Sequence, residues 1–89
     1  MSKIHKTKSS PNELDKHLGE KLRFYRTLRN ISQNSLAQSL DLSFQQIQKY
    51  EKGTNRISAS RLYKISKILD VSLLSFFNDY EEDKLLDKK

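Results

Sequence analysis

Amide side chains are the residues of this sequence best suited to chemistry with another molecule. Gln45, Gln46 and Gln48 lie close together, with Phe44 before them and Lys49 after the last of them. A glutamine amide both donates and accepts hydrogen bonds, and it can pair with two groups on the edge of an adenine base. The plain alternative is that these side chains form the solvated face of a helix.

Catalytic chemistry has much less support in the sequence. His5 lies near the N-terminus and His17 further along, and neither has a carboxylate or cysteine at a spacing typical of a metal or nucleophile site. The chain has no cysteine, which excludes disulfides and thiolate ligands. We therefore expect a protein that is not an enzyme and that has no metal and no cofactor.

The glutamines need a helix to hold them, and the surrounding residues predict two short helices joined by a tight turn. Ser32 is expected to cap the first helix and Ser43 the second, where Gln46, three residues on, completes a capping box. Gly53 is expected to end the second helix. The residues expected to face the core are Leu36, Ala37, Leu40, Ile47 and Tyr50. Two capped helices separated by a turn are typical of a helix-turn-helix that binds DNA.

Three more helices are expected from the spacing of apolar residues. The first begins after Asn12 and runs to about Arg29, another follows Ser58, and a short fifth helix covers 73–77. Gly19, inside the first, is expected to permit the close approach of another helix rather than to serve chemistry. The residues expected to share the inner face of this first helix are Leu14, Leu18, Leu22, Tyr25 and Leu28.

Length and pattern together predict the fold class. A chain of 89 residues forms one domain at most. It contains no alternating β-branched run, no glycine-rich phosphate loop and no internal repeat. We therefore predict an all-α protein, a compact five-helix bundle over residues 13–77. A basic arm at 1–12, expected to be disordered, precedes it, and a charged tail at 78–89 follows.

The charge of the chain favours a polyanionic partner. The formal net charge is +6, and residues 14–77 alone contain 11 Lys and Arg against 5 Asp and Glu. Each phosphate that such a surface neutralises releases counterions and favours binding. No apolar run approaches the roughly 20 residues that span a bilayer, and the N-terminus carries no signal-peptide core. We therefore expect a cytoplasmic protein with no membrane partner.

Residues spread over all the expected helices form one linked pattern. They are Gly19, Arg26, Ser32, Gln33, Leu36, Ala37, Ser43, Ile47, Glu51, Gly53, Leu62, Leu69 and Val71. The pattern covers about 18–77 and resembles the helix-turn-helix domain of the phage repressor and Cro type, the xenobiotic-response-element family of regulators. One position departs from it, because Asp41 stands where the turn usually has glycine. Asp tolerates a left-handed backbone better than most residues, so the turn is expected to be kept at some cost in stability.

The resemblance implies roles for individual residues, with the helix after Ser43 lying in the major groove of DNA. Base reading is implied chiefly for Gln45, and beside it for Gln46, Lys49 and Phe44. For Phe44 the alternative is a packing contact with the preceding helix. Phosphate contacts are implied for Gln33, Lys52, Asn55 and Arg56. A structural ion pair is implied between Arg26 and Glu51.

The function implied is that of a sequence-specific transcriptional regulator, with repression as its simplest mechanism. It would bind a palindromic operator in double-stranded DNA as a homodimer, its two recognition helices about 34 Å apart. Leu73, Leu74, Phe76 and Phe77 exceed the needs of a small core, so they either form a dimer interface or seal the bundle.

Two other functions are open. An antitoxin or adaptor module would hold a protein partner, with DNA binding secondary, and the apolar cluster and acidic tail support it. RNA binding is disfavoured, because the grooves of A-form helices exclude a recognition helix.

Overall fold

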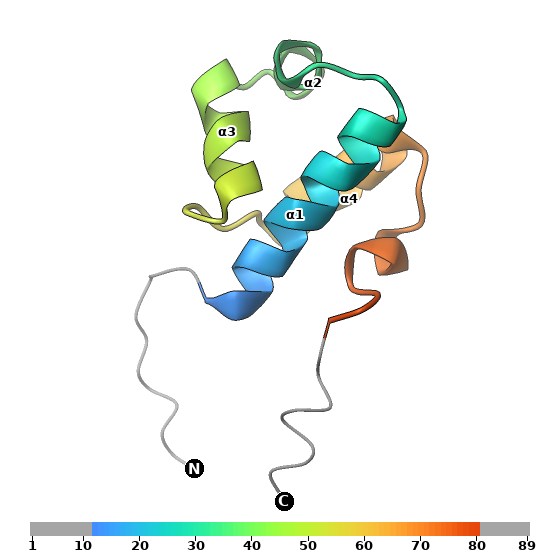
Figure 1. Ribbon diagram of the computed structural model, residues 1–89. Coiled ribbons are helices and arrows are strands. Elements are labelled where there is room, and N and C mark those ends of the chain that lie inside the picture. Colours follow the sequence, from blue (N-terminus) through green and yellow to red (C-terminus); the bar gives the residue numbers. More distant parts are fainter. Residues whose placement is uncertain (1–11, 81–89) are drawn as a thin grey trace, which may run out of the picture.

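The computed structural model describes residues 12–80, and within this range the chain is helical with no strand. The elements are α1 (Glu13–Leu28), α2 (Gln33–Leu40), α3 (Phe44–Lys52), α4 (Ala59–Leu69) and the 3-10 helix η2 (Leu73–Phe76). In Figure 1, α1 runs diagonally across the front, with α3 to its left, α2 at the top and η2 at the lower right. The all-α prediction is confirmed. His5, nearly all of the predicted arm and most of the predicted tail lie outside the described residues.

Each α-helix begins at a polar side chain that accepts a backbone N–H. The serines predicted to cap helices do so: Ser32 caps α2, Ser43 caps α3 and Ser58 caps α4. The capping box predicted at Ser43 is only half formed, since the Gln46 N–H donates to Ser43 Oγ over 3.1 Å without a described return bond. The two-way box forms at α1 instead, where a carboxylate, the stronger acceptor, replaces the amide.

The turn between α2 and α3 contains a left-handed residue, as the sequence predicted. Asp41 has φ 61° and ψ 41°, and its backbone N–H donates to the carbonyl of Gln38 over 3.1 Å. The N–H of Leu42 donates to the carbonyl of Ala37 over 2.8 Å, so the turn satisfies the last carbonyls of α2. This turn fixes the direction in which α3 leaves α2.

Eleven residues drawn from every element make up the buried core. They are Leu18, Leu22, Leu36, Ala37, Leu40, Ile47, Tyr50, Leu62, Ile65, Leu69 and Phe76. Leu14 and Tyr25 are partly buried against this cluster, in line with the predicted inner face of α1. The prediction was wrong for Leu28, because this side chain is 57% exposed. It is the last residue of α1 and lies outside the cluster of buried residues.

Gly19 lies where α1 packs tightly against the backbone of α3. A Cβ on this glycine would overlap the carbonyl oxygen of Tyr50 and would lie 2.9 Å from that of Glu51. The prediction that Gly19 permits a close helix approach is therefore confirmed. The contact holds the last turn of α3 against the middle of α1.

The predicted fifth helix is a short 3-10 helix and not a fifth α-helix of the bundle. Residues 73–76 form one 3-10 turn, with the Ser75 N–H donating to the Ser72 carbonyl over 2.9 Å. Four residues are too few to propagate an α-helix, and a 3-10 turn is common in such short connections. Phe76 is fully buried, so it belongs to the core and not to a dimer surface, whereas Leu74 is 71% exposed.

Candidate nucleic-acid interface

Helix α3 has a buried side and an open side, and the predicted base readers lie on the open one. Ile47 and Tyr50 are buried in the core, whereas Gln45 and Lys49 are exposed. Because these two are four residues apart, they are neighbours on the same face of the helix. Neither side chain makes a hydrogen bond or ion pair with another residue in the range 12–80. Their polar groups are therefore available to an external partner.

The other residues proposed to read bases lie at the margins of that face. Gln46 is half-buried, and Phe44, the first residue of α3, is exposed. The side chain of Gln46 makes no return bond to the backbone of Ser43, so its amide is not engaged in a capping box. The structure thus brings Phe44, Gln45, Gln46 and Lys49 together on one short helix.

Glu51 is the centre of a polar network at the end of α3. Its carboxylate accepts from Nε of Arg26 through Oε2 and from Nη2 of Arg26 through Oε1, the latter over 3.2 Å. The third nitrogen of Arg26 donates to the carbonyl of Ile31 over 2.8 Å. The side chains of Arg26 and Glu51 are only 12% and 4% exposed. This ion pair joins α1 to α3 where both are shielded from water.

Gln33 belongs to the same network, which the sequence did not indicate. Its Nε2 donates to Oε1 of Glu51 over 2.8 Å, from the first residue of α2 to the end of α3. A glutamine amide nitrogen carries two N–H groups, so one bond to Glu51 leaves the second N–H as a donor for a phosphate. The two residues are 18 apart in sequence, and only the packing of α2 on α3 brings them together.

The phosphate contacts predicted after α3 have different surroundings. Lys52 is exposed and Asn55 is half-buried. Arg56 forms an ion pair with Asp15, its Nε lying 2.8 Å from Oδ2. This bond ties the loop after α3 to the first turn of α1, so Arg56 has a part in the fold as well as a place on the surface.

A basic recess lies between α1, α2 and α3 and has a volume of about 320 Å³. Its lining residues are Arg23, Arg26, Gln33, Gln48, Glu51 and Lys52. We call it the basic recess because three cations there face one carboxylate. Arg23 was not predicted as a site residue, although it precedes Arg26 by three positions and so shares its side of α1. That spacing is the signal that could have found it.

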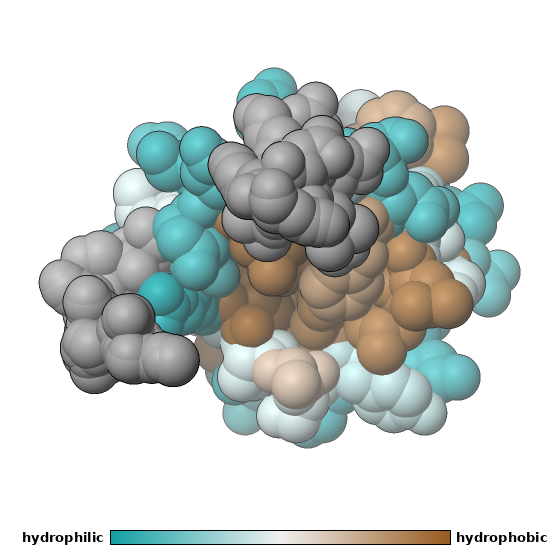
Figure 2. Space-filling model, turned by 90° about the horizontal axis from the view of Figure 1, so that it is seen from below, coloured by the Kyte–Doolittle hydropathy of each residue, from teal (hydrophilic) through white to brown (hydrophobic). Residues whose placement is uncertain are grey.

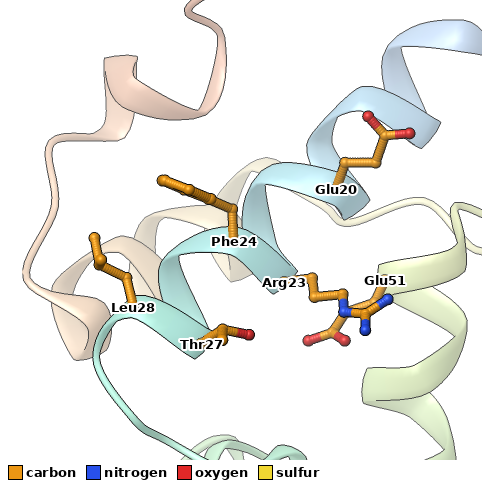
Figure 3. Close-up of a pocket in the computed structure, with 6 residues that line it drawn as sticks. All are labelled: Glu20, Arg23, Phe24, Thr27, Leu28 and Glu51. Carbon is orange, nitrogen blue, oxygen red and sulfur yellow. The ribbon is translucent and has the colours of Figure 1, made fainter.

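A second hollow, of about 440 Å³, shares Arg23 and Glu51 with the basic recess and is also lined by Glu20, Phe24, Thr27 and Leu28. Figure 3 shows Arg23 extending from α1 toward Glu51, whereas Phe24 and Leu28 point away from them. Both apolar side chains are more than half exposed. One stretch of α1 thus separates a charged surface from an apolar one.

The described residues provide neither a metal cluster nor a membrane span. No group of three or more metal-ligating side chains occurs within 12–80. No helix in that part of the chain is long and apolar enough to cross a bilayer.

Comparison with known proteins identifies the family. A helix-turn-helix family model matches residues 22–76. A protein of Sinorhizobium medicae named as an uncharacterised HTH-type transcriptional regulator is 53% identical over 76 residues, which are 85% of this chain and 55% of that protein. One from Methanocaldococcus jannaschii with the same kind of name is 39% identical over 72% of this chain and 96% of its own length.

Solved structures agree on the fold. The restriction-modification controller protein C.AhdI from Aeromonas hydrophila matches with a TM-score of 0.66 at 28% identity, over 73% of this chain and 97% of that one. The DNA-binding domain of BldD matches with a TM-score of 0.65 at 24% identity, over 79% of this chain and 97% of that one, and so bears on the fold alone.

The chain spans about half the length of the first of these relatives. The relatives are named as regulators and not as enzymes. The resemblance predicted from the sequence is confirmed. The family model covers well over half of the chain, and the protein therefore belongs to the helix-turn-helix family.

Proposed function

We propose that the protein is a sequence-specific, double-stranded DNA-binding transcriptional regulator that inserts α3 into the major groove. The observation that carries this proposal is the open face of α3. Gln45 and Lys49 are exposed there and make no side-chain hydrogen bond within 12–80, while Ile47 and Tyr50 on the opposite face are buried in the core. An amide and an ammonium at this spacing can pair with base edges. The regulators among its relatives support the same function.

Within this proposal the residues divide into two roles. Gln45 is the main base reader, with Gln46, Lys49 and Phe44 contacting neighbouring bases. Gln33, Lys52, Asn55 and Arg56 contact phosphates, which set register and affinity but carry no sequence information. The ion pair of Arg26 and Glu51 has a structural role, because it fixes the end of α3 against α1.

We further propose that two copies bind a palindromic operator as a homodimer. Apolar side chains that are exposed in the monomer lie along η2 and on the neighbouring side of α1. The exposed ones are Phe24, Leu28, Leu73, Leu74 and Phe77. Figure 2 shows the apolar surface on the face seen from below, with hydrophilic residues at its margins. A second copy covering this face would remove it from water, a gain of roughly 25 cal/mol for each Å².

Repression by blocking polymerase is the simplest outcome of such binding, in the cytoplasm where the DNA lies. Selection of bound sites from a random duplex library tests the proposal, because binding, half-site spacing and symmetry are measured together. We expect a recovered palindrome with half-sites about 34 Å apart. Recovery of sequences no different from the starting library would reject it.

One observation favours a second function, that of an antitoxin or adaptor that binds a protein partner. The apolar hollow beside Phe24 and Leu28 could receive a partner's side chains in place of a second copy. Sedimentation of the purified protein discriminates between the two. A dimer that forms without any other chain supports the regulator, whereas a monomer that enters a stoichiometric complex with another protein supports the adaptor.

A further inference from the structure

The basic recess contains an arginine, Arg23, whose guanidinium has no polar partner among the described residues. Arg23 is exposed, and its guanidinium makes no hydrogen bond or ion pair with any other residue in 12–80. Arg26, one turn further along α1, differs because all three of its nitrogens are engaged by Glu51 and Ile31. Arg23 thus has all five of its N–H donors available on a surface that borders α3.

The charges around Arg23 favour an anion. The recess contains three cations, Arg23, Arg26 and Lys52, and a single carboxylate, that of Glu51. Arg26 neutralises the carboxylate through two hydrogen bonds, whereas neither Arg23 nor Lys52 forms an ion pair with another residue in 12–80. A guanidinium matches the geometry of a phosphate, to which it can donate two parallel hydrogen bonds.

Gln33 adds a donor whose orientation is fixed. Glu51 only accepts hydrogen bonds, so the bond of 2.8 Å places the amide nitrogen of Gln33, and not its oxygen, beside the carboxylate. The second N–H of that nitrogen is free to bond an anion. Gln33 and Arg23 line the same recess, from α2 and α1.

We propose that Arg23 is a further DNA contact, which binds one backbone phosphodiester in the basic recess together with the second N–H of Gln33. This inference rests on the proposed function, and it adds a residue from α1 to a surface otherwise made by α2, α3 and the loop after α3. The contact positions the protein on the duplex. It does not select a sequence, because every phosphodiester is alike.

The test uses the selected operator with single phosphates replaced by neutral methylphosphonates, bound by the wild type and by Arg23→Gln. We expect one linkage in each half-site whose neutralisation weakens the wild type several-fold but weakens Arg23→Gln clearly less, because only the contact with Gln33 then remains to be lost. The slope of log K against log salt should also become shallower by about 0.9 for each protomer. Arg23→Gln should keep the wild-type base preference and stability, since Arg23 is exposed and makes no hydrogen bond or ion pair with another residue in 12–80.

Lys64→Gln is the matched control, because it removes one positive charge from an exposed position on α4, away from the recess. A similar loss in Lys64→Gln would show a general charge effect and overturn the inference. So would an Arg23→Gln protein that loses as much affinity as the wild type at every neutralised linkage and has the same salt slope. Failure of the proposed function is distinguishable, because the wild type itself would then select no operator.

Discussion

Gln33 donates a hydrogen bond of 2.8 Å to Glu51, and this bond joins the first residue of α2 to the last turn of α3. The same carboxylate holds Arg26 of α1. One acidic side chain therefore joins all three helices that border the proposed DNA surface. The proposed phosphate contact is linked through it to the proposed base-reading helix.

Glu51→Ala should destabilise the protein by roughly 3 kcal/mol, because it leaves the guanidinium of Arg26 buried without its counterion. Urea denaturation measures the free energy of unfolding. Glu20→Ala is the control, since Glu20 is an exposed acid on α1. Equal stabilities for the two variants would contradict a structural role for the ion pair.

Gly19→Ala should also destabilise the protein, by about 2 kcal/mol, although alanine is the better helix former. The added methyl group has no room beside the carbonyl oxygens of Tyr50 and Glu51, so α3 must move away from α1. Thermal unfolding compares this variant with Thr27→Ala, which places alanine at an exposed position of the same helix. A Gly19→Ala protein as stable as the control would show that α1 and α3 are not in close contact.

Asp41→Gly should stabilise the protein by up to about 1 kcal/mol, because glycine adopts the left-handed conformation without steric cost. Asp41→Val should have the opposite effect, since a β-branched residue is strained at φ 61°. The midpoints of urea unfolding rank the three proteins. A valine variant that matches the wild type would mean that the turn does not require a left-handed residue.

Leu74→Glu should shift the protein from dimer to monomer and weaken operator binding, while the monomer remains folded. Leu74 is 71% exposed, so a charge there costs the monomer little but would be buried in a dimer. Analytical ultracentrifugation and circular dichroism separate the two effects, with the exposed Tyr63→Glu on α4 as control. A dimer that survives in Leu74→Glu would place the interface elsewhere.

The features predictable from the sequence are those that depend on local chemistry. Ser32 and Ser58 cap helices because a serine hydroxyl accepts a hydrogen bond from the backbone N–H three residues ahead. Asp41 tolerates a left-handed backbone. Neither property depends on distant parts of the chain. Gly19 was predictable as a contact because a glycine inside a helix has a cost that packing must offset. The sequence did not indicate that the partner in this contact is the last turn of α3.

The features that escaped prediction depend on how elements meet. Leu74 and Phe76 are both apolar and nearly adjacent, yet a single 3-10 turn leaves one exposed and buries the other. The bond of Gln33 to Glu51 and the place of Arg23 in the basic recess follow from the angles between α1, α2 and α3. No periodicity along one helix carries that information.

Base recognition by Gln45 is the central claim, and site selection with Gln45→Ala tests it most directly. Gln38→Ala is the matched control, because Gln38 is an exposed glutamine on α2. We predict that Gln45→Ala still binds DNA but no longer discriminates at one base pair in each half-site, a loss of about 1–3 kcal/mol of discrimination there. Gln38→Ala should select the wild-type operator. A Gln45→Ala protein that selects the same operator with the same preference at every position would contradict the account.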